Sequence, residues 1–217
     1  MKNQLFQRRV LAILTGLMAP SCIFFGIFAR GQNLPHWYAS ISSTYYANHK
    51  IFFIGILFAT AIFYFSYKGY DWKDRVLTII QGIGVVGIIL FPCYAEGAPA
   101  YVGLFSLPIK ISHVIHCCFT ALYFFGFGFH ITFLFTLSEG NMTPQKKKRN
   151  TIYRFCGILI FVFMVVQAFT STIFRPFFGN FPTTWFNEFI MLSAFCVAWL
   201  VKGEAFSFLN DIETDKE

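Results

Sequence analysis

Charged residues are scarce in this sequence. Only 12% of the 217 residues are charged, and Asp and Glu together number 10. A soluble domain of this length carries more charge to cover its surface, so the composition argues against most soluble classes. Apolar residues take the place of the missing charged ones: 56% of the chain is hydrophobic and 21% is aromatic, including 31 phenylalanines. This balance is typical of a polytopic membrane protein.

The sequence also lacks the cysteine spacings of a zinc module or a disulfide framework. None of its six cysteines is in a C-x-x-C pair, and the adjacent Cys117 and Cys118 would point to different sides of a helix. Five of the six lie in apolar runs, where cysteine behaves as a small hydrophobic residue. There is no linker and no clear repeat either. We therefore expect a single transmembrane domain over residues 1–217.

Long apolar runs are what the sequence has instead. A helix needs about 20 mostly apolar residues to cross a bilayer. Six such runs occur, at residues 10–29, 51–67, 75–92, 111–136, 151–172 and 185–203. They predict an all-α integral membrane bundle of six transmembrane helices, with tilt or local thinning at the short second and third runs. The first run is longer than a typical signal core, so we expect it to be retained as a helix.

The basic residues are unevenly distributed between the two ends of the predicted helices. If the amino terminus is cytoplasmic, 13 of the 17 Lys and Arg fall on the cytoplasmic side and four on the other. This positive-inside pattern predicts a multi-pass protein of the bacterial inner (plasma) membrane with both termini in the cytoplasm. The run "KKKR" at 146–149 is then a topology signal that can also touch anionic lipid. We expect no nucleic-acid partner, because no recognition module accompanies the charge of +7.

Two shorter stretches admit a structural interpretation. In "YKGYDWKDR", Asp71 and Asp74 stand among Lys and aromatic residues, which favours a solvated, salt-bridged turn at the membrane interface. The stretch "GIGVVG" at 82–87 lacks the strand-turn-helix context of a phosphate loop. Its small residues favour close approach between helices.

One face of the predicted fourth helix is polar. With 3.6 residues per turn, its six polar side chains fall within an arc of about 100°: Ser112, His113, His116, Thr120, Tyr123 and His130. Such an arc must face the bundle interior or a water-filled cavity rather than lipid. His113 and His116 form an outer pair, whereas His130 lies about 20 Å deeper. No acid is predicted at the depth of His130, so we expect this histidine to be packed in the core.

An outward-facing pocket is predicted beside the outer histidine pair. The sixth helix places Glu188 about one turn below the outer surface, at roughly the depth of His113 and His116. Other polar groups of the outer side would complete a pocket between the second, fourth and sixth helices. The candidate ligand-binding residues are Ser42, Ser43, Tyr45, Tyr46, His49, Thr120, Tyr123 and Arg175.

Several functions fit such a pocket. The first is binding or handling of a lipid or another amphiphile, with membrane lipids as partners and no cofactor. The second is a lipid hydrolase in which His113, His116 and Glu188 bind zinc or another divalent metal and are the catalytic candidates. A serine hydrolase using Ser42 or Ser43 with His113 is a further option, although the sequence has no nucleophile elbow. An oligomeric, membrane-perturbing pore is the last, and the sequence leaves homo-oligomerisation open.

Three segments resemble one known family. They are "ISSTYYAN" before the second helix, "HVIHCCFTALYFFGFGF" in the fourth, and "FNEFIMLSAFCVAWLVKGE" near the end. This order is similar to that of bacterial six-helix proteins grouped with the DRAM-type (damage-regulated autophagy modulator) membrane family. The resemblance implies six spans and a role around lipids, such as lipid-anchor remodelling or control of lipid distribution. For the bacterial members it implies no established reaction. A fainter similarity is to seven-helix hydrolases with histidine-bound zinc.

Overall fold

The protein is mostly helical, as predicted. The computed structural model describes residues 2–28, 39–47, 50–67, 71–138 and 140–211. Six long helices dominate this part of the chain, and each lies close to one of the apolar runs. They are α1 (Lys2–Phe28), α2 (Lys50–Ser66), α3 (Trp72–Leu90), α4 (Ile109–Phe129), α5 (Pro144–Ser171) and α6 (Thr183–Lys202).

Short elements occupy the connections. The 3₁₀ helices are η1 (Ser42–Tyr46), η3 (Arg175–Phe177) and η4 (Ser207–Leu209). A small antiparallel hairpin pairs β1 (Tyr101–Val102) with β2 (Leu107–Pro108). The segment η2 (His130–Leu134) is a π-helix that continues α4.

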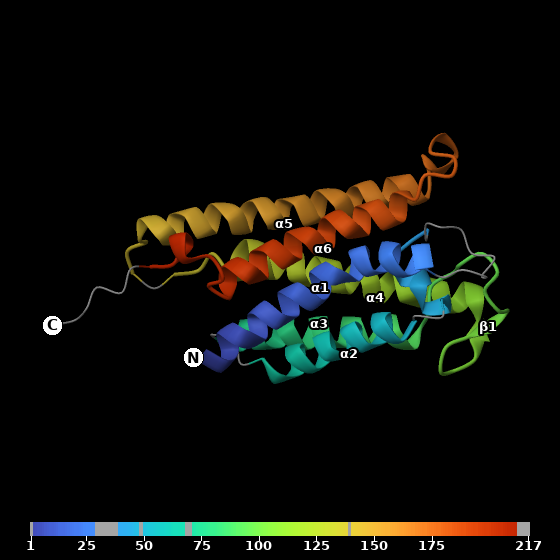
Figure 1. Ribbon diagram of the computed structural model, residues 1–217, viewed down its shortest axis with the longest axis horizontal. Coiled ribbons are helices and arrows are strands. Elements are labelled where there is room, and N and C mark those ends of the chain that lie inside the picture. Colours follow the sequence, from blue (N-terminus) through green and yellow to red (C-terminus); the bar gives the residue numbers. More distant parts are fainter. Residues whose placement is uncertain (1, 29–38, 48–49, 68–70, 139, 212–217) are drawn as a thin grey trace.

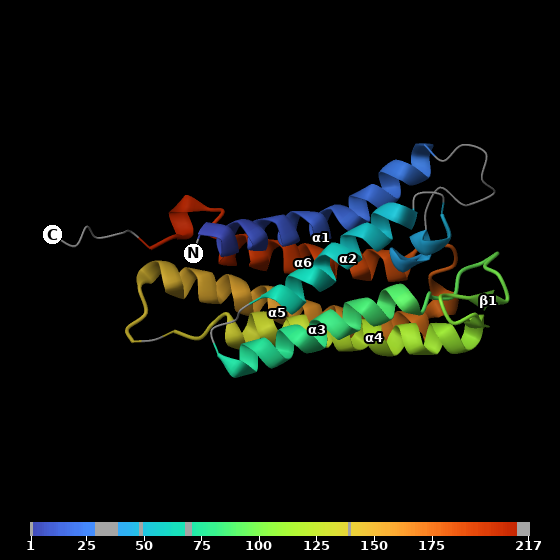
Figure 2. The same ribbon diagram turned by 90° about the horizontal axis from the view of Figure 1, so that it is seen from below.

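The six helices run along the long axis of the molecule, and consecutive helices point in opposite directions (Figures 1 and 2). The start of α1, the start of α3 and the end of α6 share one end, which we call the basal end. The β1–β2 hairpin, η1 and the starts of α4 and α6 lie at the opposite end, which we call the hairpin end. An even number of antiparallel helices accounts for the positions of the first and last helical turns at the same end.

The outer surface of the bundle is apolar. Three helical segments are long and apolar enough to cross a membrane: Ile109–Leu134, Pro144–Ser171 and Thr183–Lys202. The helix Lys50–Ser66 is apolar but shorter. Large hydrophobic side chains are exposed on every long helix, among them Leu17, Phe58, Ile83, Phe125, Val165 and Val197. Exposed apolar surface on this scale fits lipid rather than water, so the fold is that of a membrane protein.

The starts of α3 and α5 follow from their capping residues. The Asp71 side chain accepts a hydrogen bond from the backbone N–H of Asp74 at 2.8 Å, which caps α3. Thr143 does the same for α5, accepting from the Lys146 N–H at 3.0 Å, and Pro144 occupies the first helical turn.

Glycines bring α3 close to its neighbours, as predicted for the "GIGVVG" stretch. A Cβ on Gly82 would lie 2.9 Å from the ring of Phe65 in α2. A Cβ on Gly87 would lie 2.1 Å from the ring of Phe119 in α4. Because any larger residue would collide with these rings, the small residues set the spacing of α2, α3 and α4.

Aromatic rings fill the core between the helices. Phe127 of α4 meets Phe195 of α6 edge-on at a centroid distance of 5.0 Å. Trp199 of α6 meets Phe135 in the same way, also at 5.0 Å. Edge-to-face contacts of this kind stabilise a core beyond the burial of their area. They fix α4, its π-helical extension and α6 around the basal end.

Candidate functional sites

The polar face of α4 points into the bundle, which confirms that prediction. Ser112, His116, Tyr123 and His130 are buried, and the remaining two polar residues of the arc, His113 and Thr120, are partly buried. This face runs from the hairpin end to the basal end. It divides into two sites with different chemistry.

At the hairpin end, polar groups of α4 bind the backbone that follows α3. Ser112 donates to the carbonyl of Pro92 at 2.8 Å, and His116 Nδ1 lies 2.8 Å from the carbonyl of Phe91. Because a carbonyl only accepts, the proton of His116 is on Nδ1. His113 is the reverse case, since its Nδ1 accepts from the Tyr94 N–H at 3.1 Å. These bonds hold the start of α4 against the end of α3.

Glu188 is buried near the start of α6 and belongs to a different contact. Its Oε2 accepts from the backbone N–H of Ile41 at 2.6 Å, just before η1. A second bond, from the Trp185 N–H to the Ala39 carbonyl, joins the same two segments. Nearby, burial raises the pKa of the Cys93 thiol to about 12, and the charge of Glu188 adds to this effect. The carboxylate therefore anchors the η1 segment to α6.

A small cavity opens beside Glu188. It has a volume of about 30 Å³ and lies between α2, α4 and α6, where the pocket was predicted, with α1 and α3 closing it. Its polar wall contains four residues singled out in the sequence, Ser42, Thr120, Tyr123 and Glu188. The rest of its wall is almost entirely apolar: Met18, Ile41, Phe53, Leu57, Thr60, Ile88, Phe124 and Leu192. A polar group with an apolar body suits such a lining.

The other predicted pocket residues do not line this cavity, or they lie outside the part of the chain that the structure describes. The Ser43 hydroxyl donates to the Ser40 carbonyl at 2.6 Å. Tyr46 donates to the Cys93 carbonyl at 2.7 Å and packs edge-on against Tyr45. Burial, together with Cys93 and Tyr45, raises the pKa of Tyr46. His49 and the side chain of Arg175 are outside the described residues.

The proposed metal ligands bind separate backbone groups. His116 contacts Phe91 and Glu188 contacts Ile41, as given above. Among the described residues, no three His, Cys, Asp or Glu side chains come together as a metal site would need. A metal held by His113, His116 and Glu188 stays a prediction from the sequence alone.

At the basal end, His130 meets an acid, and here two expectations were wrong. His130 Nε2 lies 2.5 Å from Asp74 Oδ1, and both side chains are almost fully buried. Asp74 was expected in a solvated turn, and no acid was expected at this depth. The reason is that α3 begins at Trp72 rather than at residue 75, so Asp74 enters the first turn and faces α4. Only Asp71 keeps the exposed position predicted for both acids.

The capping pattern could have revealed this pair. Asp71 and Asp74 are three residues apart, which is the spacing of an N-cap residue and the third helical residue. Starting the helix after Asp71 puts Asp74 on the same face as the polar Gln81, seven residues later. An antiparallel neighbour would then bring the end of α4, and with it His130, to the same level.

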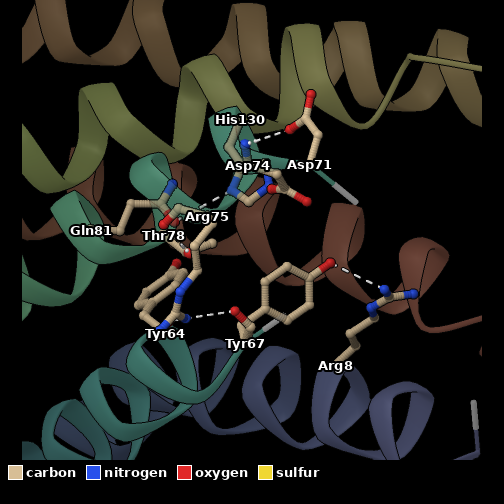
Figure 3. A network of polar contacts seen from close by, with 9 residues as sticks. All are labelled: Arg8, Tyr64, Tyr67, Asp71, Asp74, Arg75, Thr78, Gln81 and His130. Atoms are coloured by element: carbon tan, nitrogen blue, oxygen red, sulfur yellow. Dashed lines mark hydrogen bonds and ion pairs between the residues drawn. The ribbon is translucent and has the colours of Figure 1, made fainter. Parts of the chain in front are cut away.

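His130 has a closely defined environment (Figure 3). Its Nδ1 lies 3.4 Å from Gln81 Oε1 of α3. The rings of Phe135 and Trp199 meet the imidazole edge-on at 4.8 and 5.9 Å. The carbonyl of His130 accepts from the N–H of Phe135 five residues on, which is the π-helical bond. Single π-turns inside α-helices are frequent at functional sites.

Cationic side chains surround the Asp74–His130 pair at a greater distance. Arg8 of α1 donates to the Tyr67 hydroxyl at 3.1 Å and to the Lys202 carbonyl at 3.3 Å. Arg75 donates to the Tyr67 carbonyl at 2.7 Å. Lys202 interacts electrostatically with Arg8 and Asp74. The carboxylate of Asp74 is therefore balanced by more positive charge than His130 alone supplies.

Fold and sites together define a class, that of helical membrane proteins with two buried polar sites at opposite ends of one bundle. The chain matches no known family, no curated protein and no solved structure. The resemblance to the DRAM-type family therefore stays a prediction from the three segments that carry it.

Proposed function

We propose that this chain is a six-span integral membrane protein that binds the polar group of a lipid or another amphiphile in the cavity beside Glu188. The antiparallel course of six helices and their exposed apolar side chains support six spans. The distribution of Lys and Arg, 13 against four, supports cytoplasmic termini and an outward-facing hairpin end.

The cavity is the observation that carries this proposal. At about 30 Å³ it has room for one small group, not for a whole lipid. A hydroxyl or ammonium group enters, and the apolar remainder of the molecule lies along the exposed faces of the helices. The mixed lining provides for both parts, because one buried acid and four hydroxyl-bearing residues stand among apolar side chains.

Glu188 is the residue that selects a hydrogen-bond donor. One of its carboxylate oxygens is engaged by the N–H of Ile41, and an ionised carboxylate accepts several hydrogen bonds. A cationic or hydroxylic head group forms a charge-assisted bond there, which is stronger than a bond between neutral groups. A buried carboxylate of this kind discriminates against anionic head groups.

Photo-crosslinking tests the proposal. The protein is placed in liposomes that contain phosphatidylethanolamine with a diazirine in its acyl chain, and labelled peptides are mapped by mass spectrometry. Wild type is expected to label in α2 and α6 around the cavity. Glu188→Leu removes one charge-assisted bond and should lower this labelling roughly tenfold, the factor that about 1.4 kcal/mol represents.

Glu204→Gln is the matched control. Glu204 is exposed and follows Lys202, the last residue of α6, at the basal end, so its loss should leave labelling unchanged. Labelling spread evenly over all helices, or labelling that Glu188→Leu does not reduce, would overturn the proposal.

A further inference from the structure

Buried polar side chains continue from the Asp74–His130 pair toward the cavity. On α3, Asp74, Thr78 and Gln81 share one face, and each is at most 3% exposed. Their spacing of four and seven residues places them in a row about 10 Å long. A row of polar groups inside an apolar bundle costs free energy, and polar residues kept at such depth mark candidate functional sites.

The neighbouring helices extend this row. Tyr123 of α4 and His130, the first residue of η2, are seven residues apart on one helical face, and Thr120 lies one turn nearer the hairpin end. On α2, the buried Tyr64 and Thr60 are also one turn apart. The rings of Tyr64 and Tyr123 meet at 6.1 Å. Thr60, Thr120 and Tyr123 then line the cavity with Glu188. We call this set of residues, from Asp74 to Glu188, the polar column.

The buried atoms of the column without a hydrogen-bond partner among the residues that the structure describes include Gln81 Nε2 and Thr120 Oγ1. Gln81 is completely buried, and its Oε1 faces His130. Buried polar groups in folded proteins are satisfied by protein or by ordered water. The column therefore offers binding positions for water on both sides of Tyr123.

The Asp74–His130 pair holds a proton that can be exchanged. A carbonyl oxygen only accepts, so the contact with Gln81 Oε1 puts one proton on His130 Nδ1, and a second proton lies between Nε2 and Asp74 Oδ1, which are 2.5 Å apart. The proton on Nε2 can pass to Asp74 and leave at the basal end. A turn of the imidazole then brings the remaining proton to face Asp74, and the nitrogen left without a proton takes one from a water beside Gln81. One proton enters and one leaves, so the pair returns to its original protonation. Histidine is suited to this step because either ring nitrogen can carry the proton.

A purely structural role explains the pair less well. Two apolar side chains would hold α3 against α4 as firmly, because desolvating a buried ion pair offsets much of its attraction. The charged and titratable groups that face the pair come from every neighbouring helix. They are Arg8 of α1, Tyr64 and Tyr67 of α2, Arg75 of α3, Arg149 and Tyr153 of α5, and Lys202 of α6. Lys202 interacts electrostatically with Arg8, Arg149 and Asp74, and these three cations offset the negative charge when the pair has lost a proton.

We propose that the polar column is a proton path through the bundle, with Asp74 and His130 as its proton-binding site at the basal end and Glu188 at its other end. The protein would then move protons between the two sides of the membrane. This activity goes beyond binding of an amphiphile, and it needs no ligand in the cavity.

Proton flux into liposomes tests this inference. The protein is reconstituted in liposomes of phosphatidylethanolamine and phosphatidylglycerol with a trapped pH-sensitive dye, and a potassium gradient with valinomycin drives proton entry. Wild type should acidify the interior faster than protein-free liposomes. Asp74→Asn keeps an oxygen that accepts from His130 but cannot carry the proton, so flux should fall at least about tenfold.

Asp71→Asn is the matched control, since it makes the same change three residues away. Asn caps a helix as well as Asp, so α3 and the flux should be unaffected. A second variant, Gln81→Leu, interrupts the column with an apolar residue of similar size and should also slow the flux. Wild-type flux no faster than in protein-free liposomes, or full flux in Asp74→Asn, would overturn the inference. Neither result depends on lipid labelling at Glu188, so the two proposals fail separately.

Discussion

The hairpin end and the basal end each bury one acid, but they satisfy it in different ways. Glu188 accepts from a backbone N–H and borders a cavity. Asp74 meets the side chain of a histidine from another helix. A backbone donor cannot change its protonation state, whereas an imidazole can. The comparison therefore separates a site that positions a bound group from a site that can exchange a proton.

The strongest test of this difference is His130→Leu. The substitution leaves the buried carboxylate of Asp74 without its imidazole partner, and breaking a buried pair in this way costs about 3–5 kcal/mol. We expect the free energy of unfolding in detergent micelles to fall by this amount. At the hairpin end, His113→Leu removes only an acceptor for the Tyr94 N–H at a partly exposed position and should cost about 0.5–1.5 kcal/mol.

A double variant distinguishes pairing from packing. Asp74→Leu combined with His130→Leu removes both charges, and such replacements are often neutral or stabilising. The double variant should therefore be more stable than His130→Leu alone. The single variant Asp74→Leu completes the comparison. If the double variant loses as much free energy of unfolding as Asp74→Leu and His130→Leu lose together, Asp74 and His130 do not stabilise each other, and the interpretation of the basal end is wrong.

The comparison also explains what the sequence could predict. Hydrophobic runs located all six helices, because length and apolarity alone define a membrane-spanning segment. Most helix starts agree with the runs to within a few residues. The exceptions are α1 and α5, which begin eight and seven residues before their apolar runs. The polar arc correctly predicted the inward face of α4. These features depend on local periodicity, and the sequence contains that information directly.

Pairing between helices could not be predicted in the same way. A difference of three residues in the start of α3 decided whether Asp74 was in solvent or against His130. At the hairpin end, Ser42, Thr120, Tyr123 and Glu188, which the sequence placed among the pocket candidates, line one cavity. It could not show that the histidines there bond to the backbone of residues 91–94, because loop backbone leaves no pattern in the sequence.

The third prediction concerns Glu188. Replacing it by Leu leaves the buried N–H of Ile41 without its acceptor, which costs about 1–3 kcal/mol. Glu188→Gln keeps an oxygen at this position and should cost less. Unfolding of both variants in detergent checks the order. If Glu188→Leu were as destabilising as His130→Leu, the hairpin end would resemble the basal end in its dependence on charge, and the contrast between the two sites would fail.

The smallest effect is expected just beyond the basal end, where the last described residue binds the start of α5. Asp211 accepts from the Arg149 guanidinium at 2.6 Å and from the Thr143 hydroxyl, and Arg149 also donates to the Leu209 carbonyl. The hydrogen bond from Thr143, followed by that from Arg149, lowers the pKa of Asp211. A carboxyl group whose pKa is lowered by folding stabilises the fold above its ordinary pKa of about 3.9 and loses this contribution as the pH falls through the lowered value.

Because Asp211 is exposed, its contribution is small, as for most surface ion pairs, at about 0–1 kcal/mol. Asp211→Asn should therefore reduce the free energy of unfolding slightly at pH 7, and the difference from wild type should shrink as the pH falls below 4. Glu204→Gln, also exposed at this end, is the control and should show neither effect. If Asp211→Asn lost much more free energy of unfolding at pH 7, or if its difference from wild type grew as the pH fell, the segment after η4 would take part in the charge balance around Asp74 and His130. In that case the basal end would extend beyond the helices that form the pair.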